Sequence, residues 1–205
     1  MTSKSILCIR HGESTFNAAR PKAGADPLHF DAPMSAIGHE QVRLARSRLR
    51  GVPVELVVAS PLTRALQTAI GLFADHPSTP PILVSALLRE RVENSCDVGR
   101  APARLSADFP SLALSHLAEV WWHAEGVPDA RGICVEPIER VEARVAEFRT
   151  LLASRHEHSI AVVGHGTFFY HLTGTSLANC EIVELGLGLV GMRPDQLDPP
   201  FGRSR

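Results

Sequence analysis

Short apolar runs rich in β-branched residues recur along the chain and predict the strands of a sheet. Each run ends at polar or turn-forming residues, and the first stops abruptly at Arg10, His11 and Gly12. Runs of this length and composition are typical of buried strands. The predicted strands cover residues 6–9, 54–59, 81–88, 159–164 and 181–190.

Apolar residues at helical spacing lie between these runs and predict the helices. One helix follows its N-cap Ser35 and turns Leu44 and Leu49 toward the core. A second starts directly after the second strand, with Ser60 as N-cap and Pro61 in its first turn. Two further helices are expected over residues 136–154 and 168–172, and residues 13–30 are expected to form a loop or a frayed helix.

The alternation of strands and helices predicts an α/β fold, a three-layer α/β/α sandwich with a mostly parallel sheet. Residues 1–205 are expected to form a single domain, since this length suits one ordinary core. Glycine and proline interrupt the pattern over residues 91–132, which predicts an inserted lid that covers the crevice and shapes the pocket, with Trp121 and Trp122 packing inside it. The tail at residues 193–205 is expected to be poorly ordered.

The charge balance limits the kinds of binding partner that the protein can have, and the cysteine content indicates the cellular compartment. The chain has 21 Lys and Arg against 22 Asp and Glu, a balance that argues against nucleic acid or a membrane surface as the main partner. The first apolar run is too short for a signal peptide, and none approaches the ~18 residues of a membrane span. The 4 cysteines lack metal-binding or disulfide spacing. A cytoplasmic protein with reduced thiols is expected, and a homodimer is left open.

The chemically versatile residues lie where the predicted strands end. Arg10 and His11 follow the first strand, Arg64 lies one turn into the helix after the second, and Glu90 follows the third. His165 follows the fourth, between two glycines. Any one of them is explained as well by an ordinary surface or core position as by function. Because the carboxyl ends of parallel strands open onto one crevice, the set predicts a functional site there.

These residues lie in motifs that resemble the histidine phosphatase superfamily, which includes the cofactor-dependent phosphoglycerate mutases, from about residue 4 to residue 190. The resemblance implies a phosphoglycerate mutase-like fold in which His11 is the nucleophile and is transiently phosphorylated. It implies that Arg10, Arg64 and a protonated His165 hold the phosphoryl group, and Asn17 is expected to add a donor. The matching segments are residues 10–14 with Asn17, residues 60–65, Glu90, and residues 163–166.

Physical chemistry agrees with these roles. A neutral imidazole can attack phosphorus when its other nitrogen is held as a donor, and guanidinium forks match phosphate oxygens. One carboxyl group beside the leaving oxygen can serve as acid and then as base. Glu90 has the position that the resemblance implies for this group, and Glu93 in the same loop is its rival. Neither a metal nor a cofactor is expected.

The loop after Glu90 separates the alternatives within the superfamily. Its sequence over residues 90–99 departs from the Glu-Arg-x-Tyr-Gly-like pattern typical of mutases. Three segments resemble a phosphatase-type branch instead: residues 96–99, Trp121-Trp122 and residues 179–181. The leading hypothesis is a metal-independent hydrolase of a small-molecule phosphate ester. A phosphoglycerate-type mutase and a phosphate-ester binding module without turnover are the alternatives.

Two further motifs are interpreted as structural. The segment His156-Glu157-His158 lacks the His-Glu-x-x-His spacing of a metal site and is expected to be a surface loop. The glycines at 186, 188 and 191 match a dinucleotide fingerprint by letters only, because a proline-rich tail follows where a helix is needed.

Overall fold

The computed structural model describes residues 4–19 and 25–186, which form a five-stranded sheet with the order β3-β2-β4-β1-β5. Neighbouring strands run parallel except at one edge, where β5 pairs antiparallel with β1. The central strands are almost entirely apolar because both of their faces are covered. The strands are β1 Ser5–Arg10, β2 Leu56–Ala59, β3 Ile82–Val84, β4 Ser159–Gly164 and β5 Ile182–Gly186.

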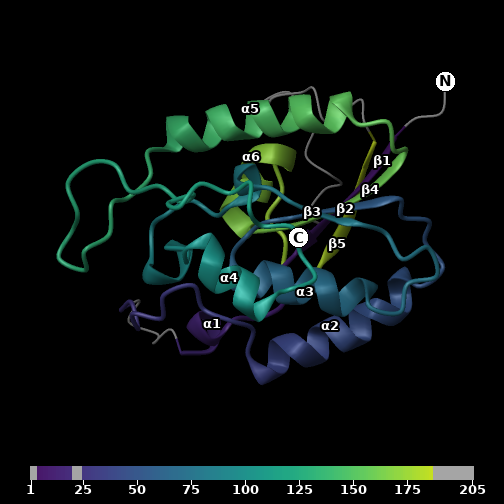
Figure 1. Ribbon diagram of the computed structural model, residues 1–205, viewed down its shortest axis with the longest axis horizontal. Coiled ribbons are helices and arrows are strands. Elements are labelled where there is room, and N and C mark those ends of the chain that lie inside the picture. Colours follow the sequence, from purple (N-terminus) through teal and green to yellow (C-terminus); the bar gives the residue numbers. More distant parts are fainter. Residues whose placement is uncertain (1–3, 20–24, 187–205) are drawn as a thin grey trace, which may run out of the picture.

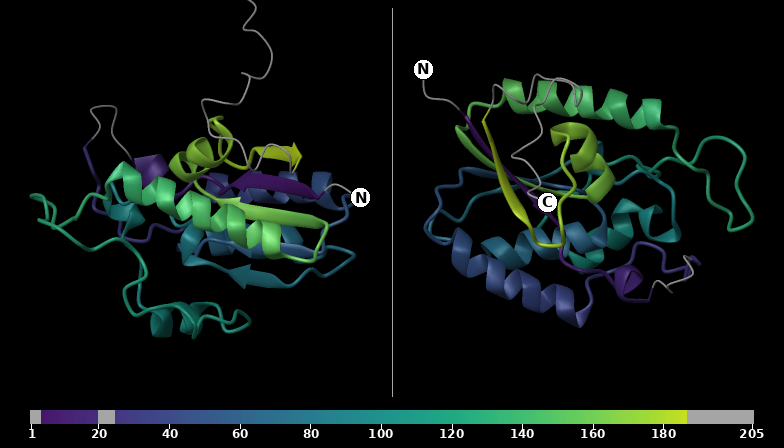
Figure 2. Two further views of the ribbon diagram at one scale, coloured as in Figure 1. Left: turned by 90° about the horizontal axis from the view of Figure 1, so that it is seen from above. Right: turned by 180° about the vertical axis from the view of Figure 1, so that it is seen from behind.

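Helices cover both faces of the sheet and complete the predicted three layers (Figure 1). On one face lie α5 (Ile138–Ser154) and α6 (Gly166–Thr173), and on the other lie α2 (Ala36–Leu49) and α3 (Thr63–Phe73), as the view from behind also shows (Figure 2). Two shorter helices, α1 (Thr15–Ala19) and α4 (Pro102–Asp108), and two 3-10 turns, η1 (Ala86–Leu88) and η2 (Ser95–Asp97), lie in the connections. The α/β fold class predicted from the sequence is confirmed.

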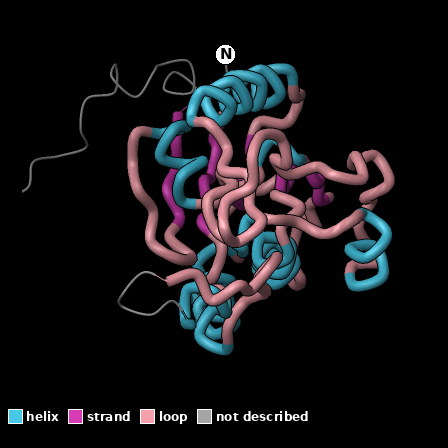
Figure 3. Tube along the Cα trace, turned by 90° about the vertical axis from the view of Figure 1, so that its left-hand side faces the viewer, coloured by secondary structure: helices cyan, strands magenta, loops and turns pink. Residues whose placement is uncertain are grey.

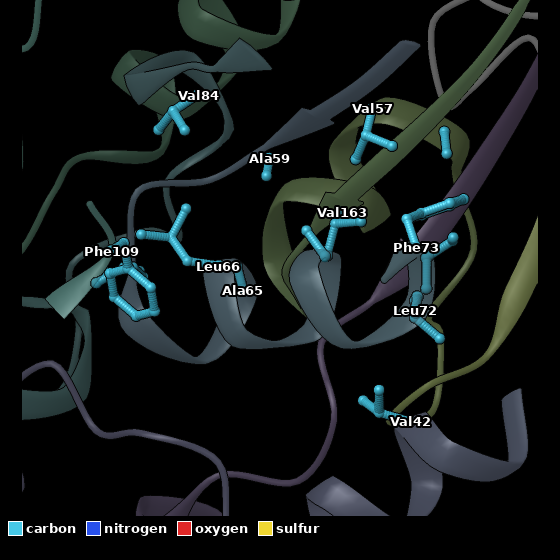
Figure 4. Packing of buried hydrophobic residues seen from close by; sticks show 14 of the residues in the cluster. Val42, Val57, Ala59, Ala65, Leu66, Leu72, Phe73, Val84, Phe109 and Val163 are labelled. Carbon is cyan, nitrogen blue, oxygen red and sulfur yellow. The ribbon is translucent and has the colours of Figure 1, made fainter. Parts of the chain in front are cut away.

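The core between the sheet and α2 and α3 depends on the almost complete burial of α3 (Figure 4). Leu66 and Leu72 of this helix are fully buried and lie beneath the strand residues Val57 and Val163. Val42 extends the same cluster from α2. Because α3 packs so closely on the sheet, its first turn is held rigidly beside the end of β2.

The core on the opposite face is organised around the aromatic residues of α5 and α6. Phe148 is fully buried, and its ring meets that of Phe168 edge-on with 5.6 Å between the centroids. We expect Phe148→Ala to lower the free energy of unfolding by about 3–5 kcal/mol, through lost burial and the cavity left behind. Urea denaturation measures the change, and the exposed Thr150→Ala on the same helix is the control, expected to stay within about 0.5 kcal/mol. Equal effects of the two variants would contradict this packing.

Two local expectations are corrected by the structure, and one is confirmed. The third strand is shorter than predicted, because the Ser85 hydroxyl accepts a hydrogen bond from the Leu87 N–H and starts the η1 turn. Ser35 does cap α2, accepting from the Gly38 N–H, and Leu49 is buried. However, Leu44 is 55% exposed, since it lies on the solvent side of α2. The prediction that Leu44 faces the core is therefore wrong.

Some predictions fall outside the described residues. These are the tail at 193–205, the end of the last predicted strand beyond residue 186, and most of the glycine-rich segment that begins there. In the described part of the chain, no helix is both long and apolar enough to cross a membrane.

Candidate active site

The predicted site residues surround a pocket at the carboxyl ends of the parallel strands. Figure 3 views the molecule from this end, where loops lie in front of the strand edges. The pocket measures about 510 Å³. Arg10, His11, Asn17, Arg64 and Glu90 all line it. His165 is fully buried and does not line the pocket, but its ring packs against that of His11, with 5.1 Å between the ring centroids.

The His11 ring is held in one tautomer by its two neighbours. Its Nε2 lies 3.3 Å from Nε of Arg64, which can only donate, so Nε2 accepts. The proton is therefore on Nδ1, which donates to the Gly12 carbonyl at 2.7 Å. Burial, followed by the charge of Arg64, holds the pKa of His11 well below its usual value. His11 is therefore a neutral imidazole whose Nε2 lone pair points toward the guanidinium group of Arg64.

Contacts distant in the sequence fix the backbone around His11. The Asn179 side-chain amide donates to the His11 carbonyl at 2.9 Å, and the Gly12 N–H donates to the Thr68 hydroxyl at 3.0 Å. Gly12 itself is needed for a close approach, because a Cβ there would lie 2.8 Å from the Gly38 carbonyl oxygen. Sequence reasoning missed Asn179 and Thr68, since neither carries a local signal for this role.

Arg64 is buried and anchored by three hydrogen bonds. Besides the contact with His11, its Nη1 donates to the Cys96 carbonyl at 2.5 Å and its Nη2 donates to Asp97 Oδ1 at 3.0 Å. Arg64 and Asp97 side chains are only 3% and 4% exposed. Asp97 was not predicted as a site residue, although it lies in the loop over residues 90–99, whose sequence distinguishes the mutase hypothesis from the phosphatase hypothesis.

Arg10 provides the second guanidinium of the pocket. Its Nη1 donates to the Leu177 carbonyl at 2.7 Å, which orients the group. Its Nε is buried and has no hydrogen-bond partner among the described residues. A buried donor of this kind is suited to bind an anionic oxygen in the pocket.

His165 contacts a residue to which the sequence analysis assigned another role. Its Nε2 lies 2.8 Å from the Ser60 hydroxyl, while its buried Nδ1 has no partner among the described residues. Ser60 is therefore not the N-cap of α3, which begins at Thr63 after Leu62. Burial, with the charge of Arg64 next, holds the pKa of His165 well below its usual value. Its protonation beside a phosphate stays a prediction.

Glu90 contacts the first turn of α6 and lines the same pocket as Arg10 and Arg64. Its Oε2 accepts from the Thr167 N–H at 3.0 Å, and its Oε1 accepts from the Phe168 N–H at 3.2 Å. Burial and then the nearby Asp97 carboxylate raise the pKa of Glu90 above its usual value. A carboxyl group that keeps its proton to higher pH is suited to general acid catalysis.

The rival Glu93 and the predicted donor Asn17 also line the pocket. The Glu93 side chain is 54% exposed and lies 3.4 Å from Arg91, so it is less constrained than Glu90. Asn17 accepts from the Ser14 N–H through its Oδ1 at 3.0 Å, which leaves its amide nitrogen as the donor. These positions favour Glu90 as the acid and agree with the donor role predicted for Asn17.

Only the first part of the predicted lid, residues 91–132, lies at the pocket. Its first residues, up to Asp97, line the pocket, but no residue from 98 to 132 does so. Instead, α4 lies beyond the edge strand β3 (Figure 2), and His116 Nε2 donates to the Val84 carbonyl of that strand at 2.8 Å. Trp121 is buried in the core cluster of α3. The lid is not confirmed, because apolar packing holds residues such as Leu105, Leu114 and Trp121 against the sheet edge, and the exposed residues 124–130 do not line the pocket.

Together, a neutral imidazole, two guanidinium groups and a carboxyl group at one pocket define a site suited to phosphoryl transfer through histidine. A sequence model of the histidine phosphatase superfamily (branch 1) matches residues 6–185. The chain belongs to this superfamily and is an enzyme of that class.

Individual relatives include both mutase-like proteins and phosphatases. The chain is 29% identical to a phosphoglycerate mutase-like protein of Arabidopsis thaliana, covering 86% of this chain and 76% of the relative. It is 25% identical to a glucosyl-3-phosphoglycerate phosphatase of Mycolicibacterium vanbaalenii, with the same coverage of 86% and 76%. Among solved structures, a putative alpha-ribazole-5'-P phosphatase of Escherichia coli has a TM-score of 0.60 at 22% identity, over 88% of this chain and 89% of that one. This last likeness supports the fold.

Proposed function

We propose that this protein is a metal-independent phosphomonoester hydrolase that acts on a small phosphate ester through a phosphohistidine at His11. The observation that carries the proposal is the locked tautomer of His11, whose Nε2 accepts from Arg64 while Nδ1 donates to Gly12. This is the form of imidazole that can attack phosphorus without first losing a proton. The guanidinium groups of Arg10 and Arg64 supply the fixed positive charge that the transferring group needs.

The reaction proceeds in two displacements. In the first, His11 Nε2 forms a bond to phosphorus, the ester P–O bond breaks, and Glu90 gives its proton to the leaving oxygen. In the second, Glu90 takes a proton from a water molecule, whose oxygen forms a bond to phosphorus while the P–N bond to His11 breaks, so that inorganic phosphate leaves and the neutral imidazole is restored. Arg10, Arg64 and His165 stabilise the charge on the phosphoryl oxygens in both steps. Glu90 thus ends the cycle protonated, as it began.

Two buried nitrogen atoms without a hydrogen-bond partner support the binding of a phosphate group in this pocket. Arg10 Nε and His165 Nδ1 are buried and have no partner among the described residues. An unsatisfied buried polar group costs about 1–3 kcal/mol. Phosphoryl oxygens at this position would give both nitrogens a partner if His165 carries its proton on Nδ1 or is protonated. Two relatives are named a glucosyl-3-phosphoglycerate phosphatase and an adenosylcobalamin/alpha-ribazole phosphatase, and these names support a small phosphorylated metabolite as the class of substrate.

A substrate panel tests the proposal. We expect the purified protein to release inorganic phosphate from small phosphomonoesters, with the same rate after dialysis against EDTA, because arginine replaces the metal as the source of positive charge. Release of phosphate from no ester in the panel would contradict hydrolysis. Transfer of labelled phosphoryl groups to an acceptor alcohol instead of water would identify the mutase alternative. Tight binding of esters without any phosphohistidine would identify a binding module.

A further inference from the structure

The buried carboxylate of Asp97 has no direct part in the two displacements above, although it helps to raise the pKa of Glu90. It lies 3.0 Å from Arg64 Nη2, and both side chains are almost completely buried. Arg64 has five N–H bonds, of which three go to Asp97, the Cys96 carbonyl and His11. Two N–H bonds are left, one on each terminal nitrogen. The direction in which they point depends on the groups that hold the other three.

Asp97 is itself rigidly placed. Its Oδ2 accepts from the Asn94 N–H at 3.0 Å and from the Glu93 N–H at 3.3 Å. These bonds close the η2 turn, which forms one wall of the pocket. One oxygen of Asp97 therefore faces the backbone of the wall, and the other faces the guanidinium. A carboxylate fixed in this way can fix the orientation of Arg64 in turn.

We propose that Asp97 is a positioning residue for phosphoryl transfer, which holds the Arg64 guanidinium with Nε toward His11 and its two remaining N–H bonds toward the phosphoryl group. The inference rests on the proposed function, since it names how one of its phosphate-binding groups is oriented. Misplacing such a group by about 1 Å is enough to slow a reaction on the order of 10²-fold. Loss of Asp97 should therefore lower kcat more than it raises KM.

The variant Asp97→Asn isolates this contact. An asparagine keeps the shape of the side chain, and its oxygen can still accept from the N–H groups of the η2 turn. Its amide N–H groups then face the N–H groups of Arg64, so the hydrogen bond to the guanidinium is lost. The matched control is Asp26→Asn, because Asp26 holds the same wall through the Ser95 N–H at 2.7 Å and makes no contact with Arg64.

A double-mutant cycle with Arg64→Ala decides between positioning and a general structural role. With p-nitrophenyl phosphate, we expect Asp97→Asn to lower kcat at least about 10-fold. Adding Asp97→Asn to Arg64→Ala should leave the rate within about 2-fold of Arg64→Ala alone, because Asp97 then has nothing to position. The effect of Asp26→Asn should multiply with that of Arg64→Ala. Multiplicative losses for Asp97→Asn and Arg64→Ala would overturn the proposal.

A second measurement is independent of turnover. In ¹⁵N–¹H NMR spectra, the Arg64 Nε–H should exchange slowly with water in the wild type and in Asp26→Asn, and rapidly in Asp97→Asn. Unchanged protection in Asp97→Asn would overturn the positioning role even if the protein hydrolysed no ester. Absence of hydrolysis together with the expected NMR change would overturn the proposed function and leave the positioning of Arg64 supported. Circular dichroism confirms that each variant is folded.

Discussion

Replacing His11 with alanine is expected to lower kcat/KM for phosphomonoester hydrolysis by at least about 10⁴-fold. The physical reason is the loss of the atom that forms the bond to phosphorus, which the remaining pocket groups cannot replace. Steady-state phosphate release measures the effect. Rapid quenching of the wild type with labelled substrate should trap phosphate on the protein in an acid-labile, base-stable form typical of phosphohistidine, and His11→Ala should trap none.

The control for this variant is an exposed histidine. His39 lies on the solvent side of α2, so His39→Ala should leave both hydrolysis and trapping unchanged. A His11→Ala protein that kept its activity would contradict the nucleophile assignment. So would a trapped phosphoryl group that His11→Ala did not remove, because it would place the covalent intermediate on another residue.

Replacing Glu90 with glutamine is expected to lower kcat/KM for an alkyl phosphate about 10²–10⁴-fold. An alkoxide is a poor leaving group without a proton, and glutamine cannot supply one. The loss should be much smaller with p-nitrophenyl phosphate, whose leaving group is stable as an anion. Comparing the two substrates therefore measures acid catalysis separately from binding. Equal losses with both would contradict the role of Glu90 as the acid.

The pH dependence of the wild type should follow the raised pKa of Glu90. Protonated Glu90 is the form active in the first displacement, so kcat/KM for an alkyl phosphate should decrease as the pH rises through this pKa. Because burial and Asp97 raise that pKa, activity should persist to higher pH than an ordinary glutamic acid would allow. In Glu90→Gln this alkaline decrease should disappear. A profile with the same decrease in both proteins would assign it to another group.

The sequence alone leaves open whether Glu90 or Glu93 is the general acid, so Glu93 is the second residue to replace. It lines the same pocket, but its side chain is half exposed, and Arg91 is its one side-chain partner among the described residues. Glu93→Gln should change the rate less than about 10-fold and keep the alkaline decrease, because its exposed side chain is not fixed by hydrogen bonds like those that hold Glu90. A larger effect of Glu93→Gln than of Glu90→Gln would exchange the two assignments.

The sequence by itself was sufficient to place the main chemistry at strand ends. A buried parallel strand has a strong local signal, a continuous apolar run, and the residue after it must emerge at the carboxyl edge of the sheet. For this reason Arg10, His11 and His165 could be assigned to one crevice before the structure was known. The start of α3 after β2 brought Arg64 there in the same way. Their assembly around one pocket follows from topology.

Several local patterns in the sequence predicted the wrong structure, because tertiary contacts decide these positions. The N-cap expected at Ser60 is a local pattern, but the hydroxyl is instead bound to His165, which is 105 residues away. The predicted third strand ended early because the Ser85 hydroxyl started a turn, and Leu44 faced solvent because helix rotation is set by packing. In each case a tertiary contact outweighed a weak local preference.

The tertiary structure also decided what surrounds the nucleophile. Asp97 and Asn179 reach Arg64 and His11 through hydrogen bonds that span 33 and 168 residues, and no periodicity or spacing reports such contacts. Leu105, Leu114 and Trp121 pack at the edge of the sheet because their apolar side chains find a core there, whereas residues 124–130 are exposed. The sequence thus predicted which residues meet at the pocket, since these follow strands directly. Only the tertiary structure decided how they are held, since orientation depends on contacts between distant segments.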